Sequence, residues 1–283
     1  MIAVKNLSFT YPKGTQPVLQ NLNFEISKGE IFGFLGPSGA GKSTTQQILY
    51  KLLTGYEGDV NIGGKSLDDW GKDYYETIGV GFELPNHYLK LTGRENLELF
   101  ASFYAKARLA DINTLFESVG LEDSIDKPVS DYSKGMKMRL NFIRAIMHNP
   151  DILFFDEPTS GMDPVNAHII KEIILDLKKQ GKTIFITTHS MSTADQLCDR
   201  IAFIVDGSLR VTDTPKALKH AHGQNQVIVE LESLERQTFS LEGLGQNSGF
   251  IEFIKQGEVS RINSMDATLE EVFIKVTGKA LKS

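Results

Sequence analysis

The segment GPSGAGKST, residues 36–44, has the composition of a loop that binds nucleotide phosphates. It fits the spacing G-x-x-x-x-G-K-[ST], it follows the apolar segment EIFGFL, and it precedes TQQILYKLLTG, which has helical spacing. Glycines let backbone N–H groups turn toward phosphate oxygens, and the N-terminus of the next helix adds its dipole. We expect Lys42 to bridge the β- and γ-phosphates and Ser43 to bind Mg²⁺. The residues predicted to contact the nucleotide are Gly36, Pro37, Ser38, Gly39, Ala40, Gly41, Lys42, Ser43 and Thr44.

The segment ILFFDEP supplies the acidic groups that such an enzyme also needs. Its four apolar residues predict a strand buried on both faces, and Asp156 and Glu157 follow at the carboxyl end, where ligands bind in open α/β sheets. We expect Asp156 to hold Mg²⁺ through water. We expect Glu157 to act as the general base for the attacking water, a role worth ~10²–10⁴ in rate. The alternative is that these acids only cap a helix.

Two further polar groups are predicted at the same edge of the sheet. His189 follows the apolar segment TIFITT, and this position favours contact with the γ-phosphate over an ordinary surface role. In GMDP, directly after the acidic strand, Asp163 has the position of a helix N-cap and Pro164 that of the first helical residue. Asp163 could also contact a partner subunit.

The elements that must position these residues alternate between strand and helix patterns, which indicates an α/β core with a largely parallel sheet. Antiparallel strands are predicted in the first section, where GDVNIGGKSL reads as a hairpin. A helical block, about residues 90–148, interrupts the core, and its first helix begins with Thr92 and Glu95 as a capping box. We predict a P-loop NTPase core with an antiparallel β subdomain, an inserted helical subdomain and a small C-terminal α+β appendage. The predicted domains are residues 1–221, which bind the nucleotide, and an accessory region of residues 222–283.

The composition limits the class of protein. The 283 residues carry a net charge of −6, which argues against a protein that coats nucleic acid, because such binding needs clustered Lys and Arg. The single cysteine, Cys198, excludes an intramolecular disulfide. No signal peptide is expected at the start, and no apolar run approaches the ~18 residues that cross a bilayer. We therefore expect a cytoplasmic chain that is able to dock on a membrane protein.

Taken together, the segments GPSGAGKST, YSKGM, ILFFDEP, SGMD and His189, in this order, resemble an ATP-binding-cassette (ABC) ATPase subunit. The resemblance covers about residues 1–220. The segments LTGRENLELF and ATLEEVFIKVTG are most similar to ATPase subunits of bacterial drug or lipid exporters. The resemblance implies ATP and Mg²⁺ as ligands. It also implies a dimer of this chain, or a pair with a closely related cassette, in the ATP-bound state.

The resemblance also assigns roles to residues that carry no obvious chemistry. YSKGM matches the family's signature loop, L-S-G-G-Q, which binds the γ-phosphate of ATP held by the opposite subunit. Tyr11 matches the aromatic residue that stacks on adenine, and Glu83 stands where the family has a glutamine that meets the metal and signals to the membrane subunit. The signature-loop residues implied to contact nucleotide are Ser133, Lys134, Gly135 and Met136.

Three departures from the family pattern leave alternatives open. In the signature loop, Lys134 replaces a glycine, so it either adds a positive charge beside the phosphate or faces water. Glu83 keeps an oxygen ligand but loses the N–H donors of an amide. Tyr11 either stacks on the base or packs into the sheet.

The function predicted from these residues is ATP hydrolysis by two chains that close around two ATP molecules and drive export through a separate membrane-spanning permease. The chain would then lie on the inner face of the cell membrane, held there by the permease. An alternative is a soluble ABC ATPase that acts in DNA repair or on ribosomes, although no long insert or basic surface supports it. A non-hydrolysing nucleotide-binding module is disfavoured by Glu157 and His189.

Overall fold

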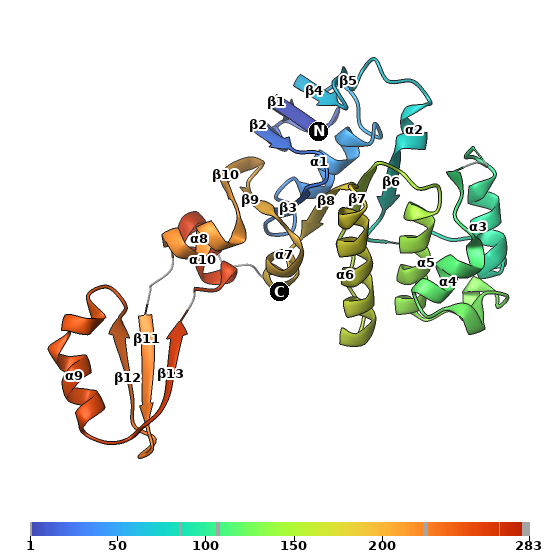
Figure 1. Ribbon diagram of the computed structural model, residues 1–283. Coiled ribbons are helices and arrows are strands. Elements are labelled where there is room, and N and C mark those ends of the chain that lie inside the picture. The colour runs from blue at the N-terminus through green and yellow to red at the C-terminus, as the bar shows by residue number, and fades with distance from the viewer. Residues whose placement is uncertain (1, 85, 106–107, 223–225, 266, 279–283) are drawn as a thin grey trace. The chain divides into compact units, whose positions relative to one another are not determined.

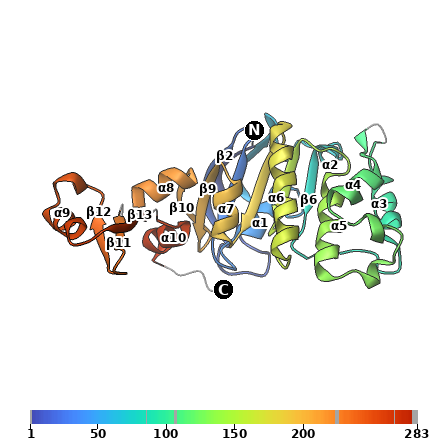
Figure 2. The same ribbon diagram turned by 60° about the horizontal axis from the view of Figure 1, so that its bottom comes forward.

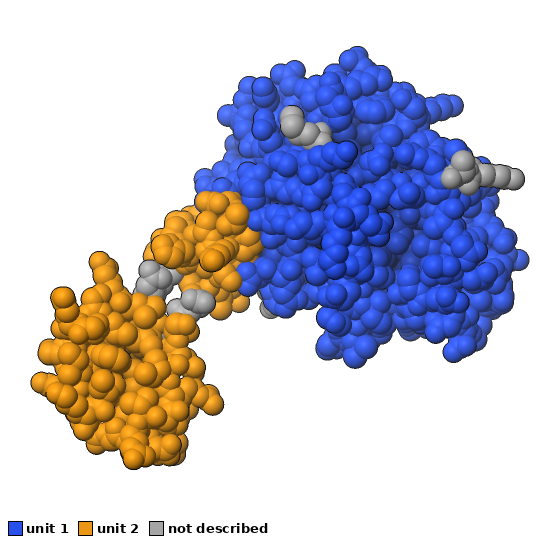
Figure 3. All heavy atoms as spheres, viewed as in Figure 1, with its two compact units in different colours: residues 1–212 blue, residues 213–283 orange. Residues whose placement is uncertain are grey.

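The computed structural model describes residues 2–84, 86–105, 108–222, 226–265 and 267–278. The chain divides into two compact units, residues 1–212 and residues 213–283 (Figure 3). We describe each unit by itself. Within the described residues, no helix is both long and apolar enough to cross a bilayer.

The centre of unit 1 is a six-stranded sheet with the order β10-β9-β3-β8-β7-β6. Neighbouring strands from β9 to β6 pair in parallel, so their carboxyl ends lie at one edge. β3 and β8 are buried along their whole length, as expected for strands with both faces covered. The strands are β3 (Ile31–Leu35), β6 (Ile78–Gly81), β7 (Ile152–Asp156), β8 (Thr183–Thr188), β9 (Arg200–Val205) and β10 (Ser208–Asp213).

A second, antiparallel sheet in unit 1 has the order β2-β1-β4-β5. Phe24 of this sheet contacts the rings of Phe32, Phe34 and Phe185 of the central sheet, which joins the two sheets through one aromatic core. The predicted hairpin over residues 58–67 is present as the pair β4 and β5. The strands are β1 (Ile2–Phe9), β2 (Leu19–Ile26), β4 (Glu57–Ile62) and β5 (Lys65–Ser66).

The helices α3, α4 and α5 form the helical block, which lies together beside β6 in both views (Figures 1 and 2). α5 can approach β6 closely because position 79 is glycine: a Cβ there would lie 2.0 Å from the carbonyl oxygen of Ala145. The helices of unit 1 are α1 (Lys42–Leu49), α2 (Tyr74–Thr77), α3 (Gly93–Ala101), α4 (Ile112–Ser118), α5 (Lys134–Ile146), α6 (Pro164–Lys179) and α7 (Met191–Leu197), with the 3₁₀ turns η2 (Glu122–Ser124) and η3 (Val129–Asp131).

Residues next to the helix ends determine where several of these helices begin and end. The capping box of Thr92 and Glu95 at α3 is confirmed, as is Asp163 as the N-cap of α6. α1 is shorter than its apolar pattern suggests: it ends at Leu49, not near Gly55, because Lys51 adopts a left-handed φ of 61° that a continuing helix excludes.

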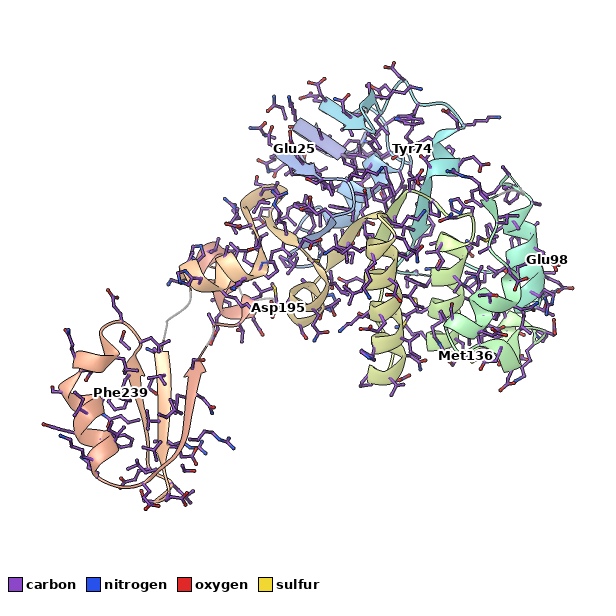
Figure 4. All side chains as sticks on the ribbon, in the orientation of Figure 1. Glu25, Tyr74, Glu98, Met136, Asp195 and Phe239 are labelled. Atoms are coloured by element: carbon purple, nitrogen blue, oxygen red, sulfur yellow. The ribbon has the colours of Figure 1, made fainter. Side chains whose placement is uncertain are left out.

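Unit 2 is a three-stranded antiparallel sheet, β12-β11-β13, with α9 packed on it. Phe239 of β12 points toward α9 and contacts the rings of Phe250 and Phe253 (Figure 4). Compact unit 2 starts at Asp213, whereas the predicted accessory region starts at 222, because α8 packs against α10 and joins this unit. The elements are α8 (Pro215–His222), β11 (Gln226–Leu231), β12 (Arg236–Ser240), η4 (Leu244–Gln246), α9 (Ser248–Lys255), β13 (Val259–Met265) and α10 (Leu269–Thr277). The predicted fold class is confirmed.

Candidate functional site

The glycine-rich loop connects the carboxyl end of β3 to the first turn of α1. Gly41 immediately precedes the helix with φ of 106°, a conformation that glycine adopts without strain. A Cβ at Gly36 would lie 2.1 Å from the carbonyl oxygen of Ile204 on β9, so only glycine fits there. The loop therefore presents the N-terminus of α1 with its unpaired N–H groups at the edge of the sheet.

Lys42 lies inside this loop as a buried cation. Its ammonium donates hydrogen bonds to the carbonyl oxygens of Gly36, at 2.7 Å, and Pro37, at 3.1 Å. Burial lowers the pKa of Lys42, and the negative charges of Glu157, Asp156 and Glu83 oppose that shift. The three predicted carboxylates thus all act electrostatically on the predicted phosphate-binding lysine.

Ser43 and Asp156 join the glycine-rich loop to the acidic strand. Ser43 Oγ donates to Asp156 Oδ2 at 2.9 Å, and Thr187 Oγ1 of the next strand, β8, donates to Asp156 Oδ1. Gln46 of α1 adds a second connection, from its Nε2 to the carbonyl oxygen of Phe155 at 3.0 Å. The carboxylate of Asp156 is therefore held in one orientation beside the hydroxyl of Ser43.

Glu157 is held by a second set of hydrogen bonds. It has a left-handed φ of 49°, a conformation that costs a non-glycine residue roughly 1–3 kcal/mol. The hydroxyl of Thr188 donates to Oε2 at 2.9 Å, and the backbone N–H of His189 donates to Oε1 at 2.7 Å. These bonds fix the carboxylate of a residue that is only 7% exposed.

The ring of His189 also contacts Glu157, with 2.7 Å between Nδ1 and Oε1. An ionised carboxylate can only accept a hydrogen bond, so Nδ1 carries the hydrogen and Nε2 is left for another partner. The imidazole is 56% exposed, which keeps Nε2 accessible to a ligand.

Glu83 and Tyr11 lie near the glycine-rich loop and the first turn of α1. Glu83 follows β6 and lines a cavity of about 760 Å³ together with Ser43 and Asp156. The hydroxyl of Tyr11 is 3.3 Å from that of Thr44, and its ring meets Phe9 edge to face at 5.0 Å. Tyr11 is 38% exposed, so it packs into the sheet on one side and has a free surface on the other.

The signature-loop residues lie elsewhere. Ser133 caps α5 and accepts from the N–H of Met136 at 3.2 Å. Met136 lies in the first turn of α5, at the end of that helix farther from α1 (Figure 4). Lys134 lies across Gly161, where a Cβ would be 2.8 Å from the lysine Cε. The carboxylate of Asp163 caps α6, where it accepts a hydrogen bond from the backbone N–H of Asn166. Its hydrogen bonds with Asn166 lower the pKa of Asp163.

The fold thus brings together Lys42, Ser43, Glu83, Asp156, Glu157 and His189. Residues 133–136 lie instead at the start of α5, and Asp163 lies at the start of α6. Two threonines that orient the acids, Thr187 and Thr188, were not among the residues predicted from the sequence. Their signal was present in TIFITTHS, since hydroxyls at the carboxyl end of β8 face the neighbouring strand β7.

Comparison with known proteins agrees with this geometry. A family model described as "ABC transporter" matches residues 19–160. A fluoroquinolones export ATP-binding protein of Mycobacterium tuberculosis (strain CDC 1551 / Oshkosh) is 50% identical over 285 residues, which cover 99% of this chain and 94% of that protein. The bacitracin transport ATP-binding protein BcrA of Bacillus licheniformis is 32% identical over 300 residues, which cover 97% of each chain.

Solved structures show the same fold. An ATP binding subunit of an ABC transporter superposes with a TM-score of 0.71 at 30% identity, covering 79% of this chain and 93% of that one. The ATP-binding cassette MJ0796, in a dimeric post-hydrolysis state bound to ADP and Pi, superposes with a TM-score of 0.69 at 28% identity. That match covers 76% of this chain and 98% of the cassette.

The hydrogen bond from Thr188 to Glu157 gives a first prediction. Thr188→Val keeps the shape of a buried side chain but removes the donor that orients the carboxylate. Because a hydrogen bond to a charged group is worth about 1.5–3 kcal/mol, we expect kcat for ATP hydrolysis to fall about 10- to 100-fold with little change in ATP affinity.

Steady-state hydrolysis and equilibrium nucleotide binding separate the two effects. Thr183→Val is the matched control, because Thr183 lies at the opposite end of β8 and its hydroxyl accepts from Gly29 N at 3.1 Å. The control is expected to keep its kcat. Equal kcat values for Thr188→Val and the wild type would show that Thr188 does not position Glu157.

Proposed function

This chain belongs to the ABC transporter family and is an ATP-hydrolysing ATP-binding subunit, and we propose that two copies close around two ATP molecules to drive export through a separate membrane-spanning subunit. One observation carries the proposal. The chain holds a lysine, a metal-side acid and a candidate base at one edge of its sheet, while its signature loop lies at the start of α5 in the helical block. A second chain would supply the missing side of each site.

In the proposed reaction, Lys42 and the N–H groups of residues 36–44 bind the phosphates of ATP. The carboxylate of Glu157, oriented by Thr188 and the backbone of His189, takes the proton of the attacking water. Nε2 of His189 faces the γ-phosphate, because Nδ1 is occupied by Glu157. Tyr11 stacks on adenine through its free surface.

The donor set fits Mg²⁺. Among the described residues, no group of three or more His, Cys, Asp or Glu side chains could hold a metal ion without help. Mg²⁺ usually takes one or two carboxylates and completes its shell with phosphate oxygens and water. Ser43, Asp156 and Glu83 would hold it, and bound Mg²⁺ would neutralise charge on the β- and γ-phosphates.

The partner chain would contribute Ser133, Lys134, Gly135 and Met136 at the start of its α5. The N-terminus of a helix favours phosphate, and Lys134 adds a positive charge there. Its side chain lies along Gly161, two residues before Asp163, so these two loops would meet the partner's site side by side. The dimeric cassette MJ0796, bound to ADP and Pi, supports a paired arrangement, either of two copies or of this chain with a related cassette.

The relatives favour transport over a soluble role in DNA repair or on ribosomes. The mycobacterial protein is an export ATP-binding protein for fluoroquinolones, and BcrA is a transport ATP-binding protein for bacitracin. We infer that this chain lies at the cytoplasmic face of the cell membrane on a permease. The helical block and the loop that carries Glu83 are the proposed docking surface, and no role with nucleic acid is proposed.

Glu157→Gln tests the proposal as a whole. The amide keeps the shape of the side chain but cannot take a proton, so ATP should bind and remain unhydrolysed. An affinity-tagged Glu157→Gln chain, extracted with ATP and mild detergent from the cells that make it, should elute as a dimer together with a multi-spanning membrane protein.

Lys42→Ala serves as the control, since it removes phosphate binding and should yield monomers. A Glu157→Gln dimer without a membrane protein would favour a soluble role. Normal turnover by Glu157→Gln would exclude Glu157 as the base.

Lys134→Ala tests the signature side alone. If Lys134 meets the partner's phosphate, its loss should weaken ATP-driven dimerisation of Glu157→Gln about tenfold and leave nucleotide binding by the monomer unchanged. Sedimentation and nucleotide binding measure the two quantities. The reverse pattern would place Lys134 at the nucleotide of its own chain.

A further inference from the structure

Glu83 differs from the other two acids of the site in how its carboxylate is held. Asp156 and Glu157 each accept hydrogen bonds from neighbouring elements. Within the part of the chain that the structure describes, no group donates a hydrogen bond to the carboxylate of Glu83, which is an exposed residue. Glu83 nevertheless acts electrostatically on Lys42 and lines one cavity together with Ser43 and Asp156. Its position therefore depends on the residues next to it in the chain.

Phe82, the residue before Glu83, packs against Tyr50 at the end of α1. The centres of the two rings lie 5.9 Å apart and their planes meet at 85°, which is an edge-to-face contact. The ring of Tyr50 also meets that of Phe154 on β7, with 6.0 Å between the centres. Tyr50 is only 8% exposed. Its ring is thus held between the central sheet and the start of the Glu83 loop.

Tyr50 belongs to the same face of α1 as the hydroxyl expected to bind the metal. Ser43, Gln47 and Tyr50 stand at positions i, i+4 and i+7, which share one face of a helix, and all three line the cavity that contains Glu83. Helix α1 therefore carries Ser43 in its first turn and, as the residue that ends it, the ring that contacts the Glu83 loop.

The ring of Tyr50, and not its hydroxyl, makes these contacts. Burial raises the pKa of Tyr50, and the negative charge of Asp156 adds to that shift, so the hydroxyl stays protonated at physiological pH. Among the residues that the structure describes, none forms a hydrogen bond with this hydroxyl, whereas two aromatic rings contact the ring itself.

The backbone on both sides of the Phe82 ring is also fixed. β6 ends at Gly81, where a Cβ would lie 2.8 Å from Cδ1 of Phe155, so this strand end is pressed against β7. The carbonyl oxygen of Phe82 accepts a hydrogen bond from Asn141. With its backbone and its ring both held, Phe82 is a fixed point from which the side chain of Glu83 extends.

We propose that Tyr50 positions Glu83 for the metal of the ATP site, because its ring fixes Phe82 and thereby the adjacent carboxylate beside Ser43 and Asp156. The inference rests on the proposed function, in which Glu83 is a ligand of Mg²⁺, and adds the residue that places this ligand. Mg²⁺ demands near-ideal ligand geometry, and a carboxylate without a donor of its own has no other means of keeping that geometry. Tyr50 touches neither ATP nor the metal and is a positioning residue.

The test measures equilibrium binding of a fluorescent ATP, once with Mg²⁺ and once with EDTA. All chains carry Glu157→Gln, so that ATP is not hydrolysed. Tyr50→Leu removes the aromatic ring, and we expect the Kd with Mg²⁺ to rise about tenfold, while the Kd in EDTA stays within about twofold. Tyr50→Phe keeps the ring and should retain both constants.

Glu83→Ala completes the comparison. It should show the same loss with Mg²⁺, and Tyr50→Leu added to it should have no further effect, because a residue cannot position a ligand that is absent. Phe239→Leu is the matched control, since it removes a ring that packs against two others in unit 2, and it should keep both constants.

Two results would overturn the inference and leave the proposed function intact. One is unchanged binding with Mg²⁺ in Tyr50→Leu beside a loss in Glu83→Ala. The other is a loss in Tyr50→Leu that is equally large in EDTA or that adds to the loss in Glu83→Ala, because Tyr50 would then act on the fold and not on Glu83. Unchanged binding in Glu83→Ala would instead remove Glu83 as a metal ligand, and both the metal assignment and the inference would fall.

Discussion

The hydrogen bond between Ser43 and Asp156 joins two parts of the chain that are distant in sequence, and the rest of the site depends on it. Ser43 is presented by the helix after β3, and Asp156 ends β7. β8 lies between these strands and contributes the hydroxyl that orients Asp156 from the other side. Parallel pairing is what allows this convergence, because it places the carboxyl ends of all three strands at one edge. An antiparallel β8 would carry Thr187, Thr188 and His189 to the opposite edge.

A second constraint acts between the Glu83 loop and α5. Asn141 donates to the carbonyl oxygen of Phe82 at 2.7 Å, and the ring of His87 meets the carbonyl oxygen of Lys137 at 2.9 Å. Burial lowers the pKa of His87 to about 4, so its ring is neutral at physiological pH and donates through Nε2. Together with the hydrogen bond from Arg144 to the carbonyl oxygen of Asn86, these bonds connect the loop to α5 at three points. We propose that, because of these three bonds, a displacement of the Glu83 loop would move α5 with it.

The sequence predicted those parts of the site that are local. GPSGAGKST needs only a preceding strand and a following helix, and Thr92 and Asp163 are N-caps that act within three residues. The pairs between distant elements could not be read in this way. Thr188 with Glu157 and Arg144 with Asn86 are separated by 31 and 58 residues, and their meeting depends on strand order and on how α5 packs against β6. The length of α1 was missed for a related reason, since its apolar pattern continues while the backbone turns at Lys51.

The central claim is that the glycine-rich loop of one chain faces the signature loop of another. A direct measurement introduces one cysteine per chain, Ser38→Cys in one and Ser133→Cys in the other, with Cys198→Ser in both. Ser38 and Ser133 are exposed, so a short bis-maleimide can reach either thiol. We expect a cross-linked pair only when the two chains are mixed with ATP and hydrolysis is blocked. A cross-link that forms equally well without ATP, or one that forms within a single chain carrying both cysteines, would contradict it.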